Sequence, residues 1–468
     1  KLHFVFLPMV AYGHMIPAVD MAKLFVSRGL KVTVVTTPAF SELVLKARES
    51  GHDIGLRIIG FPPEGSPLKG DVVSMDQVTE DTHGEFLAAV ELMRAPFEEF
   101  LEELGPDAVV SDMFLPWSAE SAGKFGLPRL VFHGTSYMAL CCSDQMRVYK
   151  PYEAVDSDSE PFILPNLPHR LEFFRSQLPP EEHSDNSFAG LRNQMAEAEK
   201  ITHGALMNTF DELESDYARH YRNAMKKRAW SIGPLILCGG AGGKEELGSR
   251  GKKSAVDEHE CMRWLDSKAD HSVVYVCFGS MAVFSDAQLR ELAAGLRDSS
   301  RNFVWVVRKT EGGGGNGWLP EGFEETTSET GMIIRGWAPQ VLILNHPSVG
   351  AFVTHCGWNS TLEGIAAGVP MVTWPVFAEQ FYNEKLIVDV LKIGVSVGSK
   401  KWQRVGSEGV AAEAVTAAVE RVLFRDSAEE MRRRAKDYQA KAKIAVKGGG
   451  SSYNELNDFV EDIRNYKP

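Results

Sequence analysis

The sequence predicts an α/β protein with two domains, each built on a doubly wound parallel sheet. Short apolar runs rich in β-branched and aromatic residues alternate with longer segments of helical pattern through most of the 468 residues, as strands and helices do in a parallel sheet. The runs are nearly continuously apolar, which is typical of strands covered by helices on both faces. The alternation occurs twice, before and after a segment rich in Gly, Ser and charge over 238–254.

Six strands are predicted in each half of the chain. Those of the first half are residues 3–7, 31–37, 56–61, 107–113, 129–134 and 204–210, and those of the second are 272–280, 303–308, 331–337, 350–356, 370–376 and 393–397. Helices are predicted between them over 18–26 and 86–104, and from Asp286 to Leu296 behind Ser285, a favourable N-cap residue.

The domain limits follow from the linker-like composition of 238–254, which has almost no apolar residue. We expect a first domain over 1–237, a flexible linker over 238–254 and a second domain over 255–445. The remaining residues, 446–468, are expected to form a C-terminal helix that packs back on the first domain.

A glycine-rich run over 311–317 formally matches the dinucleotide fingerprint G-x-G-x-x-G through Gly312, Gly314 and Gly317. That fingerprint must join a strand directly to a helix. The residues that follow here, WLPEGF, do not start a helix, so the run predicts a loop and no nicotinamide cofactor.

The charge balance excludes some classes of partner. Fifty Lys and Arg against 63 Asp and Glu give a net charge of -13, which argues against binding to a nucleic-acid backbone or an anionic membrane surface. No run of 18 apolar residues is present, so no membrane insertion is expected. Six cysteines without a C-x-x-C pair favour reduced thiols and a cytoplasmic location. If such an acidic chain binds phosphates, it must hold them without bulk positive charge.

His14 and Asp112 each follow or end a predicted strand, at the sheet edge where open α/β sheets bind ligands. His14 is expected immediately before the first helix. A histidine oriented by a carboxylate can remove a proton from a hydroxyl, because the carboxylate stabilises the imidazolium that forms. The alternative is a structural histidine. No G-x-S-x-G elbow accompanies the pair, so an acyl-enzyme is not expected.

The densest cluster of chemistry-bearing residues lies between Trp337 and Gln380. A predicted strand ending in THC runs through a glycine turn into a helix start, where free amides and the helix dipole make an anion site. His355 could add a donor, Trp337 a flat face for a base, and Glu363 an acceptor for ribose hydroxyls. The alternative is that His355 and Trp358 are core residues and the polar residues only cap the helix.

These 44 residues resemble the signature box of plant family 1 UDP-dependent glycosyltransferases of secondary metabolism, from WAPQ through HCGWNSTLE to the final Glu-Gln pair. The segments GHMIP, SDMF, WSIGPL and VVYVCFGS extend the resemblance over nearly the whole chain. FHGTSYMAL, at 132–140, is most similar to the subgroup that glucosylates flavonoids, coumarins and triterpenoids.

The resemblance implies a GT-B fold of two facing Rossmann-like domains, with the acceptor bound mainly by the first and the UDP-sugar mainly by the second. Trp337 would stack on the uracil and Ala338 would contact it through its backbone. The other implied donor contacts are Gln340 and Glu363 for ribose, His355, Asn359, Ser360 and Ser280 for the diphosphate, Trp358, Glu379 and Gln380 for the sugar, and Thr135 as a further sugar contact. Gln380 and Trp358 favour glucose.

The resemblance also implies an inverting mechanism with His14 as base and Asp112 as its partner, and no metal or other cofactor. The expected product is a β-glucoside of a flavonoid or other phenolic; a triterpenoid or steroid acceptor, or a non-catalytic sugar-nucleotide-binding protein, are the alternatives. We expect a monomer that binds only the UDP-sugar and a small acceptor. Candidate acceptor-pocket residues are Tyr12, Phe114, Trp117, His133, Tyr137, Met138, Phe377 and Ala378.

Overall fold

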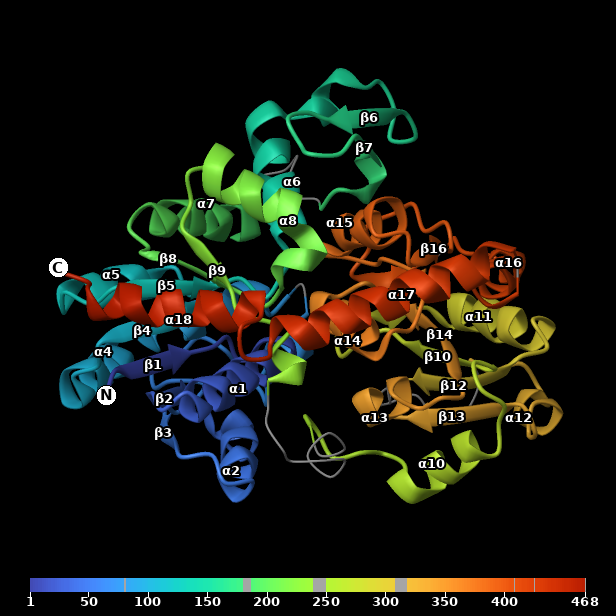
Figure 1. Ribbon diagram of the computed structural model, residues 1–468, viewed down its shortest axis with the longest axis horizontal. Helices are drawn as coiled ribbons and strands as arrows, with labels where there is room; N and C mark the ends of the chain where they lie inside the picture. The colour runs from blue at the N-terminus through green and yellow to red at the C-terminus, as the bar shows by residue number, and fades with distance from the viewer. Residues whose placement is uncertain are drawn as a thin grey trace.

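A computed structural model describes residues 1–79, 81–179, 187–238, 250–307, 318–407, 409–424 and 426–467 (Figure 1). It consists of two halves, each organised around a parallel sheet with helices on both faces. Most of the predicted linker, 239–249, and the glycine-rich run at 311–317 lie outside the described residues.

The sheet of the first half has seven strands in the order β3-β2-β1-β4-β5-β8-β9, all parallel. Its strands are β1 (His3–Leu7), β2 (Lys31–Thr36), β3 (Ile54–Ile58), β4 (Ala108–Asp112), β5 (Arg129–Phe132), β8 (Gly204–Met207) and β9 (Ala229–Ser231). Because β1 lies between β2 and β4, the connections leave β1 and β4 toward opposite sides and open a crevice at their carboxyl ends.

The second sheet has six strands in the order β13-β12-β10-β14-β15-β16, also all parallel. Its strands are β10 (Val273–Cys277), β12 (Asn302–Val307), β13 (Gly331–Arg335), β14 (Val349–Thr354), β15 (Met371–Thr373) and β16 (Gly394–Ser396). Here the crevice opens between β10 and β14. All twelve predicted strands are present, so the prediction of a doubled α/β fold is confirmed.

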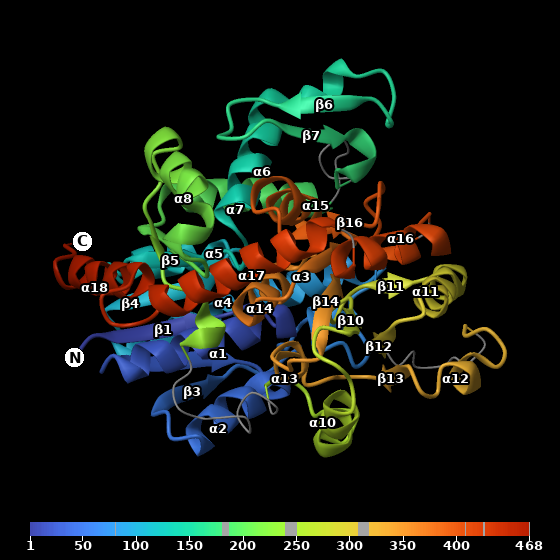
Figure 2. The same ribbon diagram turned by 45° about the vertical axis from the view of Figure 1, so that its right-hand side comes forward.

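Five further strands were not predicted. They are β9, the antiparallel pair β6 (Pro161–Leu164) and β7 (Leu171–Phe174), and the short parallel pair β11 (Val283–Phe284) and β17 (Val405–Ser407). The β6–β7 hairpin stands beside α15 of the second half (Figure 2), and Phe173 packs edge-on against Tyr382 with ring centroids 5.4 Å apart. The hairpin therefore joins the two halves.

The helices cover both faces of each sheet. In the first half they are α1 (Tyr12–Ser27), α2 (Ser41–Glu49), α3 (His83–Glu91), α4 (Arg94–Leu104), α5 (Trp117–Lys124), α6 (Tyr137–Tyr149), α7 (Ser187–Lys200) and α8 (Asp211–Arg219). In the second half they are α10 (Glu258–Asp266), α11 (Asp286–Asp298), α12 (Phe323–Thr326), α13 (Gln340–Leu344), α14 (Trp358–Ala367), α15 (Gln380–Lys385) and α16 (Ala412–Leu423). The chain ends in α17 (Asp426–Ala445) and α18 (Ser451–Arg464).

Two helix predictions were wrong in their bounds. The first helix begins at Tyr12, not at residue 18, so His14 lies in its first turn and not before it. Pro17 obscured this start, because a proline inside a helix removes one backbone hydrogen bond and suggests a boundary. The single helix predicted over 86–104 is two helices, α3 and α4, separated at Leu92 and Met93.

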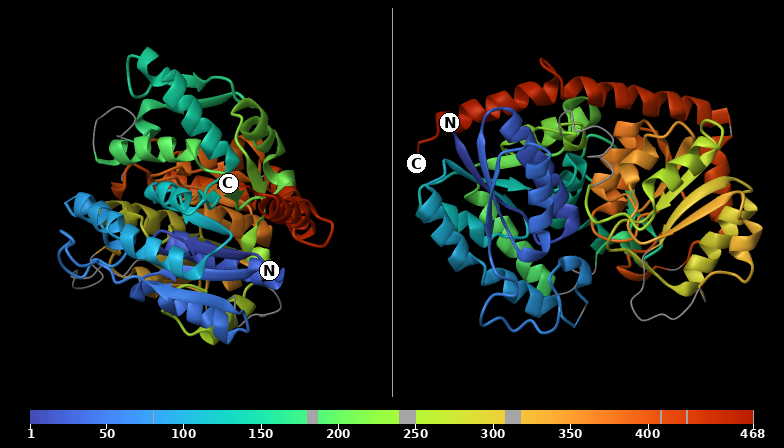
Figure 3. Two further views of the ribbon diagram at one scale, coloured as in Figure 1. Left: turned by 90° about the vertical axis from the view of Figure 1, so that its left-hand side faces the viewer. Right: turned by 90° about the horizontal axis from the view of Figure 1, so that it is seen from below.

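The last two helices run across one face of the molecule and span both halves (Figures 1 and 3). α17 contacts α14 and α16 of the second half and α8 of the first. α18 contacts β9, and Phe459 packs with Phe4 and Phe25 in the core of the first half at ring distances of 5.7 and 5.9 Å. Among the described helices, none is both long and apolar enough to cross a membrane.

Candidate functional site

His14 and Asp112 form a hydrogen-bonded pair at the carboxyl edge of the first sheet. His14 Nδ1 lies 2.6 Å from Asp112 Oδ2. Asp112 ends β4 and is 1% exposed, whereas the His14 side chain in the first turn of α1 is 20% exposed. Asp112 Oδ1 also accepts from the Phe114 amide at 3.0 Å, which fixes the carboxylate. A carboxylate partner requires the proton on Nδ1, so Nε2 is the nitrogen that can accept a proton.

The surroundings of His14 favour its protonated form. Burial by itself would lower the pKa of His14, but the charge of Asp112 and the hydrogen bond to it outweigh that effect, and the carboxylates of Glu379 and Asp76 add to it. The net result is a raised pKa. This is the arrangement expected for a base that must hold a proton after taking it from a hydroxyl.

His355 follows β14 and is held between two glycines. A Cβ on Gly279 would lie 2.7 Å from His355 Cε1, and a Cβ on Gly357 would collide with Nε2. Burial lowers the pKa of His355 to about 4, so the ring is neutral at pH 7. Its Nδ1 has no hydrogen-bond partner among the described residues. The ring is therefore a partly buried, neutral polar group aligned by its packing.

The helix that follows His355 begins at a glycine. The N-cap of α14 is Gly357, which offers no side-chain cap, and the Glu379 carboxylate accepts from the backbone amide of Trp358 in the first turn. Asn359 and Ser360 do more than cap the helix, since their side chains bond to the Gly13 carbonyl and to Gln340. The first-turn amides are backbone donors that, with the helix dipole, form a site for an anion.

Trp337, Gln340, Ser360 and Glu363 lie together next to this helix. Gln340 Nε2 donates to Glu363 Oε2 at 2.6 Å and to Ser360 Oγ at 3.1 Å. Trp337 is partly exposed, and its backbone carbonyl accepts from the Ala255 amide at 2.7 Å. Ala338 is buried, and its carbonyl accepts from the Gln340 amide at 2.8 Å.

The two halves are bonded directly at the site. Asn359 Nδ2 donates to the Gly13 carbonyl at 2.7 Å, and Trp358 Nε1 donates to the Asn208 carbonyl at 2.8 Å. The Gly13 carbonyl lacks its usual helical donor, because the residue four positions later is Pro17. Pro17 thus leaves the Gly13 carbonyl, next to His14, free to accept from Asn359 of the second half.

Asp76 is a site residue that the sequence analysis missed. Its carboxylate accepts from Ser280 Oγ at 3.0 Å and from Ser74 Oγ at 2.9 Å, and its charge is one of those that raise the pKa of His14. It lies in a short 3-10 turn, Met75–Gln77. No sequence pattern relates Asp76 to Ser280, which is 204 positions away.

Glu379 and Gln380 lie at the end of the segment that begins at Trp337. Gln380 is 3% exposed, and its Oε1 accepts from the Val376 and Phe377 amides at 2.9 and 3.0 Å, which aligns its side-chain nitrogen. Burial raises the pKa of Glu379 despite hydrogen bonds and the charge of His14. Glu379 thus lies within electrostatic reach of His14 in the other half.

The candidate acceptor residues divide into two groups. Tyr12, Phe114, Phe377 and Ala378 are partly or fully exposed, and the Phe114 ring lies edge-on to His14 at 5.5 Å. Buried members are Trp117, His133, Tyr137 and Met138, and Thr135, the predicted sugar contact, is buried as well. Their role stays a prediction. His133 has both ring nitrogens without a hydrogen-bond partner among the described residues, and burial lowers its pKa to about 4.

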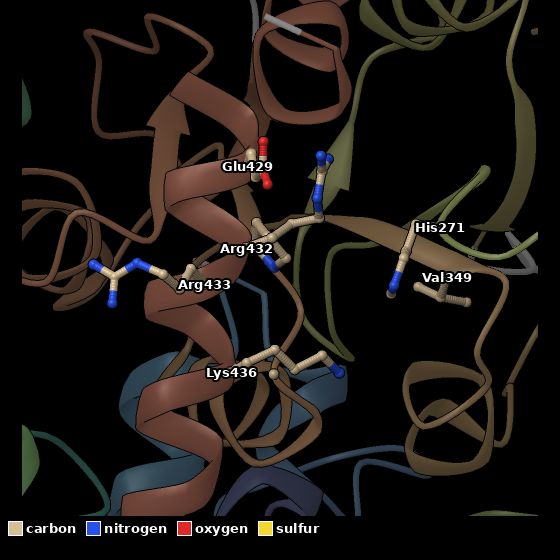
Figure 4. Close-up of a pocket in the computed structure, with 8 residues that line it drawn as sticks. His271, Val349, Glu429, Arg432, Arg433 and Lys436 are labelled. Carbon is tan, nitrogen blue, oxygen red and sulfur yellow. The ribbon is translucent and has the colours of Figure 1, made fainter. Parts of the chain in front are cut away.

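A separate cavity of about 250 Å³ lies away from these residues. Its lining is His271, Val349, Gly368, Pro370, Glu429, Arg432, Arg433 and Lys436 (Figure 4). Val349 begins β14, whereas His355 follows its last residue, so the cavity is at the opposite edge of the sheet. Arg433 points away from His271 (Figure 4) and is paired with Glu430 at 2.8 Å. None of the predicted site residues lines this cavity.

Comparison with known proteins gives close matches over the whole chain. Residues 248–438 match the family model described as "UDP-glucoronosyl and UDP-glucosyl transferase". The scopoletin glucosyltransferase of Nicotiana tabacum is 51% identical over 473 residues, covering 100% of this chain and 98% of that protein. The anthocyanin 3'-O-beta-glucosyltransferase of Gentiana triflora is 47% identical over 479 residues, covering 100% and 99%.

Solved structures also match over nearly the whole chain. The crystal structure of Glycyrrhiza uralensis UGT73P12 with glycyrrhetinic acid 3-O-monoglucuronide has a TM-score of 0.92 and 38% identity, covering 99% of this chain and 96% of that one. The structure of Phytolacca americana UGT2 with UDP-2fluoro-glucose and pterostilbene has a TM-score of 0.77 and 25% identity, covering 99% and 100%.

Proposed function

The chain belongs to the family of UDP-glucuronosyl and UDP-glucosyl transferases, and we propose that it transfers glucose from UDP-glucose to a hydroxyl of a small phenolic acceptor with inversion at the anomeric carbon. It is a UDP-glycosyltransferase with the GT-B fold, and its close relatives are glucosyltransferases of small plant metabolites. The roles of individual residues below are part of the proposal.

His14 acts as the general base. Its Nε2 removes the proton of the acceptor hydroxyl while Asp112, bonded to Nδ1 at 2.6 Å, stabilises the imidazolium. The acceptor oxygen then forms a bond to the anomeric carbon as the bond from that carbon to the β-phosphate oxygen breaks. Attack from the face opposite the leaving UDP converts the α-linked donor to a β-glucoside.

The leaving diphosphate is stabilised by neutral donors. The first-turn amides of α14, a helix with a glycine N-cap, and the neutral His355 ring supply hydrogen bonds and the positive end of a helix dipole, with Asn359, Ser360 and Ser280 beside them. Trp337 stacks on the uracil, and Gln340 and Glu363 bind the ribose. This arrangement explains how an acidic chain can bind a diphosphate, and we infer that no divalent cation is required.

The two halves divide the work between them. The first half, 1–237, binds the acceptor beside His14, and the second, 255–445, binds UDP-glucose, with the C-terminal helix resting on the first half. The observation that carries the proposal is the bond from Asn359 to the Gly13 carbonyl, because it brings the proposed diphosphate segment against the residue that precedes the base. Trp358, Glu379, Gln380 and Thr135 would then contact the glucose.

The acceptor is inferred from the relatives. Scopoletin, anthocyanin and flavonoid glucosyltransferases are each 47% or more identical to this chain, which favours a flat phenolic. A triterpenoid is the second candidate, because the structural neighbour with a TM-score of 0.92 holds glycyrrhetinic acid 3-O-monoglucuronide.

The test is a product assay with UDP-glucose against scopoletin, a flavonol, an anthocyanidin and glycyrrhetinic acid, resolved by chromatography and mass spectrometry. We expect a mass gain of one hexose on a phenolic, with β-configuration by NMR, in the presence of EDTA. His14→Ala should lose this product with weakly acidic alcohols. UDP binding without a glycoside from any acceptor would contradict the proposal, and a faster reaction with UDP-galactose or UDP-glucuronate would contradict the choice of glucose. We also propose that the enzyme is a monomer, and its sedimentation coefficient tests this.

A further inference from the structure

Arg250 joins the two halves through a pair of buried carboxylates. Its guanidinium lies 2.7 Å (Nη2) and 3.1 Å (Nε) from Asp20 Oδ2 in α1, and Nη1 also contacts Glu363 Oε1 in α14. The three side chains are 16%, 8% and 6% exposed. Charge-assisted, multidentate bonds of this kind are stronger than neutral hydrogen bonds. Both oxygens of Glu363 are thereby engaged, since Oε2 accepts from Gln340.

The residues that follow Arg250 contact Trp337. Gly251, with φ of +91°, packs so closely against the Trp337 ring that a Cβ would collide with Cζ2. Lys252 Nζ lies 4.4 Å from the centre of the Tyr12 ring, and the Tyr12 ring is 5.8 Å from that of Trp337. The chain that leads into α10 thus starts between the two halves (Figure 1) and runs over the residues proposed to bind uridine.

We propose that residues 250–253, here named the strap, are an autoinhibitory segment that occupies the uridine subsite and is displaced when a uridine diphosphate binds. The inference rests on the proposed function, which assigns Trp337 to the uracil and Glu363 to the ribose. A ribose diol that donates to Glu363 competes with Arg250 and Gln340, because each oxygen of that carboxylate is already bonded to one of these side chains. A uracil stacked on Trp337 competes with Gly251 for the ring.

The strap lowers the apparent affinity for UDP, which is the intrinsic affinity multiplied by the fraction of molecules in which the strap is open. When binding requires an open state, the apparent Kd is the intrinsic Kd divided by the fraction of molecules in that state. A strap closed nine-tenths of the time therefore raises the apparent Kd roughly tenfold. Loosening the strap should give tighter UDP binding, which is the opposite of what removing a ligand contact does.

The experiment is calorimetric titration of UDP into the wild-type protein and four variants. Arg250→Ala removes the bonds to Asp20 and Glu363, and Gly251→Ala keeps Arg250 but drives the segment off Trp337. Both should lower the Kd of UDP by roughly three- to tenfold. Arg433→Ala removes an exposed arginine at the opposite edge of the second sheet, and should leave the Kd unchanged.

The outcomes separate this inference from the proposed function. Weaker UDP binding by Arg250→Ala would make Arg250 a nucleotide contact and overturn the strap, as would an unchanged Kd in both strap variants. Glu363→Ala tests the subsite itself. Because it also removes the contact with Arg250, it is compared with Arg250→Ala, and a Kd of UDP as low as in that variant would overturn the assignment of the ribose site. If Glu363→Ala abolishes UDP binding while both strap variants bind UDP like the wild type, the strap proposal is wrong and the assignment of the ribose site stands. Circular dichroism confirms that each variant is folded.

Discussion

Asn359 of the second half donates its side-chain amide to the carbonyl of Gly13 in the first half over 2.7 Å. The acceptor is available because Pro17 has no N–H to offer it. One bond therefore connects the proposed diphosphate segment to the helix turn that carries His14, and its position depends on a proline in the first half and an asparagine in the second.

Asn359→Ala should lower kcat/KM for UDP-glucose by roughly 10- to 100-fold, because it removes a bond to Gly13 and a donor to the diphosphate, and hydrogen bonds to charged groups contribute about 1.5–3 kcal/mol. Steady-state kinetics measure the loss. The control is Asn345→Ala, an exposed asparagine of the same half whose amide donates only locally, to Val341 at 2.8 Å. Equal activity of the two variants would refute the role of Asn359.

Pro17→Ala tests the same bond from the other side. The new N–H can donate to the Gly13 carbonyl and compete with Asn359, so we expect a few-fold loss of kcat/KM with an unchanged or higher melting temperature, since alanine is the better helix former. A variant with full activity would show that the carbonyl accepts both donors without cost.

Asp112→Asn should move the acid limb of the pH profile of kcat/KM to lower pH. Catalysis requires neutral His14 in the free enzyme, and its raised pKa places the wild-type limb above pH 6.5, the ordinary value for histidine. Without the Asp112 charge, burial lowers the pKa of His14. The plateau should also fall by about 100-fold or more, because an asparagine amide favours the tautomer with the proton on Nε2.

Asp76→Asn is the matched comparison for that profile. Asp76 also raises the pKa of His14 but makes no hydrogen bond to it, so the limb should shift by less and the plateau should remain near that of the wild type. A limb in Asp112→Asn at or above the wild-type position would rule out Asp112 as the main source of the raised pKa.

Much of the fold was predictable because strands buried on both faces are continuous apolar runs, and all twelve such runs form the two sheets. The unpredicted strands carry no such signal. β9 has only three residues and pairs with β8 by tertiary context, while β6 and β7 form a small hairpin outside the main sheets.

The site was predictable where its residues are contiguous. Trp337 to Gln380 lie on neighbouring connections of one sheet, so sequence order keeps them together. Asp76 and Arg250 were missed because their partners Ser280 and Glu363 are 204 and 113 positions away. Only the docking of the two halves creates those contacts, and a single acidic or basic residue in a loop gives no indication of its partner.

Gly279→Ala should weaken UDP binding about tenfold or more. Gly279 has φ of +70°, and a Cβ there would lie 2.7 Å from His355 Cε1 and Nε2, so the ring must leave its position beside the α14 amides. Gly322→Ala is a closely matched control, since its φ is +69° and a Cβ there meets no atom within 4 Å. Both variants should lose about 1–2 kcal/mol from the left-handed backbone, but only Gly279→Ala should change the Kd of UDP. Equal affinities would show that His355 is not held by Gly279.

Glu214→Gln should stabilise the protein more at pH 8 than at pH 5. Glu214 is 3% exposed and accepts from the Tyr137 and Met138 amides at the start of α6 at 3.3 and 3.0 Å, yet burial raises its pKa to about 7.

The folded state therefore binds a proton that the unfolded state releases above its ordinary pKa near 4.5. This contribution to stability is fully present below pH 4.5 and is lost as the pH rises to 7 and beyond, a change on the order of 3 kcal/mol at most. Glutamine does not ionise, and it keeps one acceptor oxygen for one of the two amides. Melting temperatures at the two pH values measure the effect, and Glu384→Gln, at a second buried glutamate whose pKa burial raises to about 7, should behave alike. A gain of equal size at pH 5 and pH 8 would mean that Glu214 does not ionise in this range.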